Sequence, residues 1–116
     1  MVFDKTVDFQ IDGKTYKLCY PLRYVWEAER QLSSKNFLLL IGNAANDVPP
    51  GMGDIYTIFK YALLGGNPGM TEDQVDELYL KALEDHPMIE LFRAALQALE
   101  KSGVLGQRKK EQAAEA

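Results

Sequence analysis

Histidine and cysteine are almost absent from this sequence, which contains one residue of each, His86 and Cys19. A single cysteine cannot form an internal disulfide, and the two residues cannot supply the usual His/Cys ligand set of a structural zinc site. Long apolar runs are lacking too: the longest, at residues 37–41, falls far short of the roughly 20 residues that a membrane-spanning helix needs. Residues 1–5 lack the basic start and apolar stretch of a secretory signal, so we expect none.

Basic residues are outnumbered: the chain has 13 Lys and Arg residues, 17 Asp and Glu residues and a net charge of −4. This balance disfavours a surface that follows nucleic-acid phosphates. Hydrophobic residues make up 47% of the 116 residues, enough for one folded domain. We expect that domain to span residues 1–106. Residues 107–116 have no apolar side chain larger than alanine, which predicts a disordered polar tail.

Asp12 and Gly13 predict a tight β-hairpin, because both central positions of such a turn need positive φ. Pairing outward from this turn places the apolar side chains on one face, namely Val7, Phe9, Ile11, Tyr16 and Leu18. The opposite face pairs Asp8 with Lys17 and Gln10 with Thr15. A lone hairpin is marginally stable in water, so we expect its apolar face to lie on helices.

Two helices are predicted after the hairpin. Pro21 suits the first position of a helix that runs to about Leu32. Its buried stripe is predicted to consist of Leu22, Val25 and Trp26. The apolar run at residues 37–41 could be a buried strand or part of a helix, and periodicity alone does not decide between them. Its length and its single β-branched residue favour a helix from about residue 36 to residue 45.

Three further helices follow the loop at residues 46–53. Asp54 is the predicted N-cap of the first, and residues 65–69 are expected to end it, with a glycine in the left-handed position after the helix. Thr71 and Gln74 predict a capping box at the start of the second. The third is predicted to begin at Pro87 and to be closed by Ser102 and Gly103. The expected core-facing stripes are Ile55, Ile58, Phe59, Ala62 and Leu63; Val75, Leu78, Tyr79, Ala82 and Leu83; and Met88, Leu91, Phe92, Ala95, Leu96 and Leu99. The predicted fold class is mostly α (α+β), an N-terminal hairpin packed on about five short helices.

No catalytic, metal or cofactor site emerges from the residues. His86 beside Asp85 has no partnered nucleophile, so a capping or surface histidine is favoured. Cys19 is expected to be a partly buried thiol on the polar side of the hairpin. Four carboxylates open one helix opposite its apolar stripe, where solvated acids are usual: Glu72, Asp73, Asp76 and Glu77. The glycine-rich stretches at residues 51–53 and 65–69 lack the Gly-Lys-Ser/Thr of a phosphate loop and are interpreted as helix ends. The basic residues 108–110 have no aromatic neighbours to stack on nucleic-acid bases.

The order of these elements resembles the small tail assembly chaperones of long-tailed bacteriophages and related gene-transfer agents. Those families have a hairpin of the form idGkeykL, a Gly-Asp pair before a helix, and lTeeevdell at the start of the next helix. The matching segments here are residues 11–18, 53–54 and 70–78. Residues 5 to about 101 are compatible with this plan.

The resemblance implies a non-enzymatic chaperone, without a cofactor, that binds the tape-measure protein and hands it to tail tube subunits. It also implies a protein of the host bacterial cytoplasm that is absent from the mature virion. Nucleic acid and membranes are not expected partners, and self-association and the binding face are left open. The alternative is a structural head–tail or tail completion protein that stays in the virion.

Overall fold

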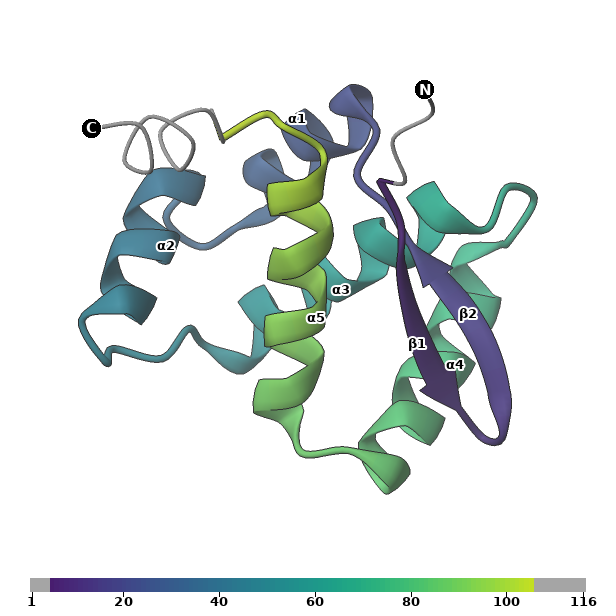
Figure 1. Ribbon diagram of the computed structural model, residues 1–116. Helices are drawn as coiled ribbons and strands as arrows, with labels where there is room; N and C mark the ends of the chain where they lie inside the picture. The colour runs from purple at the N-terminus through teal and green to yellow at the C-terminus, as the bar shows by residue number, and fades with distance from the viewer. Residues whose placement is uncertain (1–4, 106–116) are drawn as a thin grey trace, which may run out of the picture.

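The computed structural model describes residues 5–105, which form a two-stranded hairpin and five helices (Figure 1). The elements in chain order are β1 (Val7–Ile11), β2 (Lys14–Leu18), α1 (Leu22–Gln31), α2 (Phe37–Ala45), α3 (Met52–Gly66), α4 (Glu72–Asp85) and α5 (Met88–Lys101). The predicted α+β class, a hairpin packed on five short helices, is therefore confirmed. The predicted tail at residues 107–116, which includes the basic residues 108–110, lies outside the described residues.

The hairpin has the turn and the register that its sequence predicts. Asp12 and Gly13 both have positive φ, 53° and 78°, as a two-residue hairpin turn requires. The observed pairs are Val7 with Leu18, Asp8 with Lys17, Phe9 with Tyr16, Gln10 with Thr15, and Ile11 with Lys14. On the polar face, Lys17 Nζ lies 2.6 Å from Asp8 Oδ1. Three side chains of the apolar face are buried, namely Phe9, Ile11 and Leu18.

Helix α3 is the central helix, because it packs against β2, α1, α4 and α5. All five side chains of its predicted stripe are buried: Ile55, Ile58, Phe59, Ala62 and Leu63. Thr57 and Tyr61 are buried as well, so neighbours cover most of the circumference of α3. The Thr57 hydroxyl donates to the carbonyl oxygen of Gly53 at 2.8 Å, which satisfies this buried polar group. Helix α3 thus supports the hairpin and three of the other helices.

Gly65 and Gly66 lie inside the last turn of α3, where we expected them only to end the helix. A Cβ atom on Gly65 would lie 2.2 Å from the carbonyl oxygen of Cys19, and one on Gly66 would lie 2.2 Å from that of Lys17. The two glycines therefore let the chain at the end of β2 cross α3 closely. The left-handed glycine of this stretch is Gly69, with a φ of 91°, and it lies two residues beyond the helix cap instead of directly after it. Asn67 caps the helix with a φ of −133°, and its side-chain amide donates to a carbonyl of the last turn at 2.8 Å.

Helix α1 buries a different face from the predicted one. Leu22 and Trp26 are 53% and 57% exposed, whereas Val25 and Ala28 are buried, as is Leu32 just after the helix. The buried positions also follow helical spacing, at i, i+3 and i+7. Helix α1 packs on α3 with the small Ala28 at the buried face, which allows a close approach and leaves the larger Leu22 and Trp26 outside.

Three helices begin at positions that differ slightly from the predictions. Pro21 and Pro87 are the N-cap residues of α1 and α5, not their first helical residues. Helix α3 begins earlier than predicted, with Gly51 as its N-cap, so Asp54 lies inside the first turn. The Asp54 carboxylate instead accepts two hydrogen bonds from Ser33, from the backbone N–H at 2.9 Å and from Oγ at 2.7 Å. These bonds tie the start of α3 to the link between α1 and α2.

The predicted capping is confirmed at the start of α4 and at the end of α5. At the start of α4, Thr71 Oγ1 accepts from the Gln74 N–H at 3.2 Å and Gln74 Oε1 accepts from the Thr71 N–H at 2.9 Å. These two bonds form the capping box. After α5, Gly103 has a φ of 85° and its N–H donates to the Glu100 carbonyl at 3.1 Å, as in a glycine helix cap.

Candidate functional site

Large apolar side chains are exposed on α1, on α2 and after the end of α5. We call four of them, Leu22, Trp26, Leu38 and Val104, the apolar surface. Trp26, Leu38 and Val104 line one hollow of about 340 Å³. Leu22 lies one helical turn before Trp26, so the two share a side of α1. Leu38 is 71% exposed, and exposed apolar groups gathered around a hollow are typical of protein-binding sites.

Helix α2 exposes leucines because its sequence is apolar on every side while only one side is covered. Of its nine residues, only Phe37 and Leu40 are buried, and Leu38 and Leu39 are exposed. Figure 1 shows α2 at the left edge of the molecule, beside α5 and away from the hairpin. A helix at an edge can bury only the side that faces the body, so its remaining apolar side chains meet solvent.

The first turn of α2 is held in place by specific hydrogen bonds. Asn36 is its N-cap, and the Asn36 Oδ1 accepts from the Leu39 N–H at 3.0 Å. Glu29 of α1 accepts from the Phe37 N–H at 2.9 Å. The Phe37 ring also meets the Tyr20 ring edge-on, with centroids 6.3 Å apart. These contacts fix the first turn of α2, and with it the exposed leucines, relative to α1.

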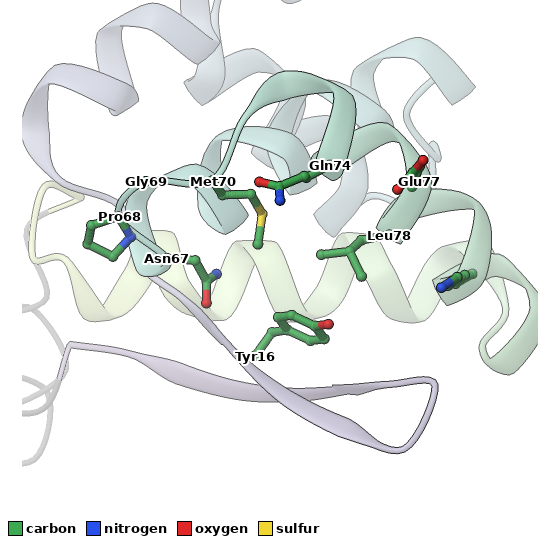
Figure 2. A pocket seen from close by; sticks show the side chains of 9 residues that line it. Tyr16, Asn67, Pro68, Gly69, Met70, Gln74, Glu77 and Leu78 are labelled. Carbon is green, nitrogen blue, oxygen red and sulfur yellow. The ribbon is translucent and has the colours of Figure 1, made fainter.

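A second hollow, of about 450 Å³, lies between the hairpin and α4. Figure 2 shows Tyr16 of β2 facing Leu78 of α4, with Met70 nearby. Its amide side chains already serve the fold: Gln74 completes the capping box, and Asn67 donates to the Lys17 carbonyl at 2.8 Å. This hollow therefore offers apolar contact and no nucleophile paired with a base.

His86 links the hairpin to the last two helices through two hydrogen bonds and a ring contact, which together we call the His86 clamp. It is the C-cap residue of α4, as its sequence position predicts. Its Nε2 lies 2.7 Å from the Gln10 carbonyl oxygen, its Nδ1 lies 3.0 Å from Glu90 Oε1, and its ring packs on Phe9 with centroids 4.5 Å apart. Both partners are acceptors, so only the protonated ring can donate to both. The Gln10 carbonyl raises the pKa of His86 most, Glu90 and Asp85 raise it further, and partial burial opposes them.

The other predicted site residues are dispersed. Cys19 is partly buried, as expected. The carboxylates that open α4 are exposed, as expected, and two of them bind α3: Glu72 pairs with Lys60 at 3.3 Å, and Asp76 accepts a hydrogen bond from the Tyr56 hydroxyl. Burial, and then this bond to Asp76, raise the pKa of Tyr56. Within residues 5–105, no group of three or more His, Cys, Asp or Glu side chains is arranged to hold a metal ion.

The sequence prediction missed the exposure of Leu22 and Trp26. It assigned both to the core because they are large and apolar at helical spacing. The signal for the alternative is a second stripe that shares Val25 and continues through Ala28 and Leu32. Two stripes on one helix leave one of them outside whenever the helix packs on a single neighbour.

Comparison with known proteins gives no relative from which a function could be inferred. No protein-family model, curated protein or solved structure matches the chain. In the described part of the chain, no helix combines the length and the apolar character needed to cross a bilayer.

Proposed function

We propose that this protein is a tail assembly chaperone of a long-tailed bacteriophage or gene-transfer agent. In this role it is a binding protein and not an enzyme. It holds the tape-measure protein in the host cytoplasm, helps to recruit tail tube subunits, and leaves before the virion is complete. The observation that carries the proposal is the apolar surface formed by Leu22, Trp26, Leu38 and Val104.

The apolar surface suits a chaperone because it is exposed, preorganised and modest in size. A long helical client with apolar stripes needs such contacts to stay soluble until the tube covers it. A hollow of about 340 Å³ takes up a few side chains of the client, which favours an affinity low enough for release. A structural protein that stays in the virion does not need to dissociate from its partner.

The segments that carry the resemblance support the same proposal. Residues 11–18 span the hairpin turn and β2, and residues 70–78 contain the capping box and the first turns of α4. The Gly-Asp pair at residues 53–54 lies in the first turn of α3 and not just before the helix. Two of the three segments thus occupy the elements that the resemblance implies, and the third is displaced by one turn.

Co-expression with the tape-measure protein from the same gene neighbourhood tests the proposal. We expect the soluble fraction of the tape-measure protein to rise with the wild-type chain and with Leu80→Asp. We expect Leu38→Asp to lose this effect, because it places a charge in the apolar surface. Leu80 is a matched control: it is an exposed leucine on α4, away from α2 (Figure 1). Equal solubility with and without the chain would refute the proposal.

Mass spectrometry of purified virions separates the proposal from its alternative. A chaperone is absent from these particles or present only in traces. A stoichiometric amount of this protein in the virion would identify a head–tail or tail completion protein instead.

A further inference from the structure

A groove of about 510 Å³ runs between α2 and α5, next to the apolar surface. We call it the α2–α5 groove. Figure 1 shows these two helices side by side and running in opposite directions. The loop after α2 contributes Pro49 and Pro50 at one end. The groove therefore has two helical walls and one end formed by prolines.

The floor of the α2–α5 groove is apolar. Helix α5 contributes Ile89, Phe92 and Leu96, which follow one stripe at i, i+3 and i+7. Helix α2 contributes Ile41 and Ala44 from one face. Ile89 is 38% exposed, so the stripe is open to a partner at this end. An amphipathic helix that docks in a groove presents apolar anchors at the same spacing, so its stripe can pack along this one.

The rim of the groove carries two charges of opposite sign on α5. Arg93 and Glu100 both line the groove and are both exposed. They are seven residues apart, so they lie on the same side of the helix at a separation of about 10 Å. Neither side chain takes part in an ion pair within residues 5–105. Asp47, also exposed, adds a negative charge after the end of α2.

We propose that the α2–α5 groove binds one amphipathic α-helix of the client. The helix places its apolar stripe on the floor, an acidic residue near Arg93 and a basic residue near Glu100. This inference rests on the proposed chaperone function, since the client supplies the helix. Three helical turns of a partner cover the distance from Ile89 to Glu100, which is about 16 Å along α5.

A second copy of this chain is a poorer occupant of the groove. The exposed apolar side of α1 is flanked by Arg23 and Arg30, which are also seven residues apart. Docked in the groove, α1 would bring one arginine near Arg93, where the like charges repel. Helix α2 carries no charged residue to match either end. A client helix with one charge of each sign fits the rim better.

A synthetic peptide tests the groove without the client. The probe is an alanine-rich helical peptide of about 18 residues with a leucine stripe, flanked by one Glu and one Lys seven residues apart. Its affinity for the full-length chain is measured by fluorescence anisotropy. We expect Ile89→Asp to weaken binding about tenfold or more, because it puts a charge on the apolar floor.

The rim is tested by reversing single charges. Glu100→Lys is expected to weaken binding of the Glu/Lys peptide by about threefold and to strengthen binding of a Glu/Glu peptide by a similar factor. Glu84→Lys is the matched control, since Glu84 is an exposed glutamate on α4 and does not line the groove. Unchanged melting temperatures establish that the variants remain folded.

Two results would overturn the groove proposal. One is peptide affinity that is the same for Ile89→Asp, Glu100→Lys and wild type. The other is self-association of the free chain that Ile89→Asp abolishes, which would make a second copy the occupant.

Co-expression with the client keeps the two proposals separate. If Ile89→Asp keeps the client as soluble as wild type does, the groove proposal fails and the chaperone role stands. If the peptide binds as expected but the client stays insoluble, the chaperone role fails.

Discussion

Alanine at Gly65 is predicted to destabilise the fold strongly, although alanine favours helices. Gly65 lies in the last turn of α3, where the chain leaving β2 crosses the helix. The added Cβ would lie 2.2 Å from the Cys19 carbonyl oxygen and 2.4 Å from Cδ of Pro21. Backbone and a proline ring cannot rotate away as the end of a flexible side chain can. The helix and the crossing segment must therefore separate.

The magnitude follows from two opposing effects. Replacing glycine by alanine within a helix contributes about 1 kcal/mol of stability. Inserting one carbon into a packed contact costs about 1–3 kcal/mol, and a gap that must open by about 1 Å against backbone falls at the upper end. We expect a net loss of about 2 kcal/mol in the free energy of unfolding. For a domain of this size, this loss lowers the melting temperature by about 8 °C.

Thermal and urea denaturation of Gly65→Ala and Gly42→Ala measure this effect. Gly42 is a matched control: it also lies inside a helix, but a Cβ there meets no atom of the described structure within 4 Å. Gly42→Ala should therefore stabilise the protein by up to about 1 kcal/mol. An unchanged or raised melting temperature for Gly65→Ala would refute the close crossing of β2 over α3.

Three further predictions concern the hairpin turn, the contacts of His86, and the hydrogen bonds between Asp54 and Ser33. Gly13→Val should cost about 1 kcal/mol or more in urea denaturation, because a β-branched residue disfavours a φ of 78°; no loss would refute the turn. The folded state raises the pKa of His86, so wild type should exceed His86→Asn in free energy of unfolding by its largest amount below pH 6.5. This difference should shrink as the pH rises through the raised pKa. A constant difference from about pH 5 to pH 9 would refute the His86 clamp. Asp54→Ala should cost about 1 kcal/mol by losing both bonds to Ser33, and Ser33→Ala should add little to it in the double variant.

Local chemistry explains which parts of the fold could be predicted from the sequence. The hairpin register depends on the turn at Asp12 and Gly13, and the start of α4 depends on the Thr71 capping box. Both are decided by residues within a few positions of each other, so the sequence contains the full cause. The role of Gly65 depends instead on a segment more than 40 positions earlier in the chain, which no local pattern reveals.

The apolar surface could not be predicted because its residues resemble core residues. Trp26 and Leu38 are large and apolar at helical spacing, and sequence alone assigns such side chains to the interior. Only the packing of α1 on α3 decides which of two stripes is buried. Likewise, Arg93 and Glu100 look like ordinary solvated charges until the structure places both along one groove.

Hydrogen exchange of the complex with the tape-measure protein tests the chaperone role most directly. Exchange of each backbone amide is measured for the protein alone and for the protein bound to its client. Binding at the apolar surface and the α2–α5 groove predicts slower exchange in α1, α2 and α5, with the hairpin and α4 unchanged. Protection confined to the hairpin and α4, or no complex at all, would contradict the proposed role of the surface around α2.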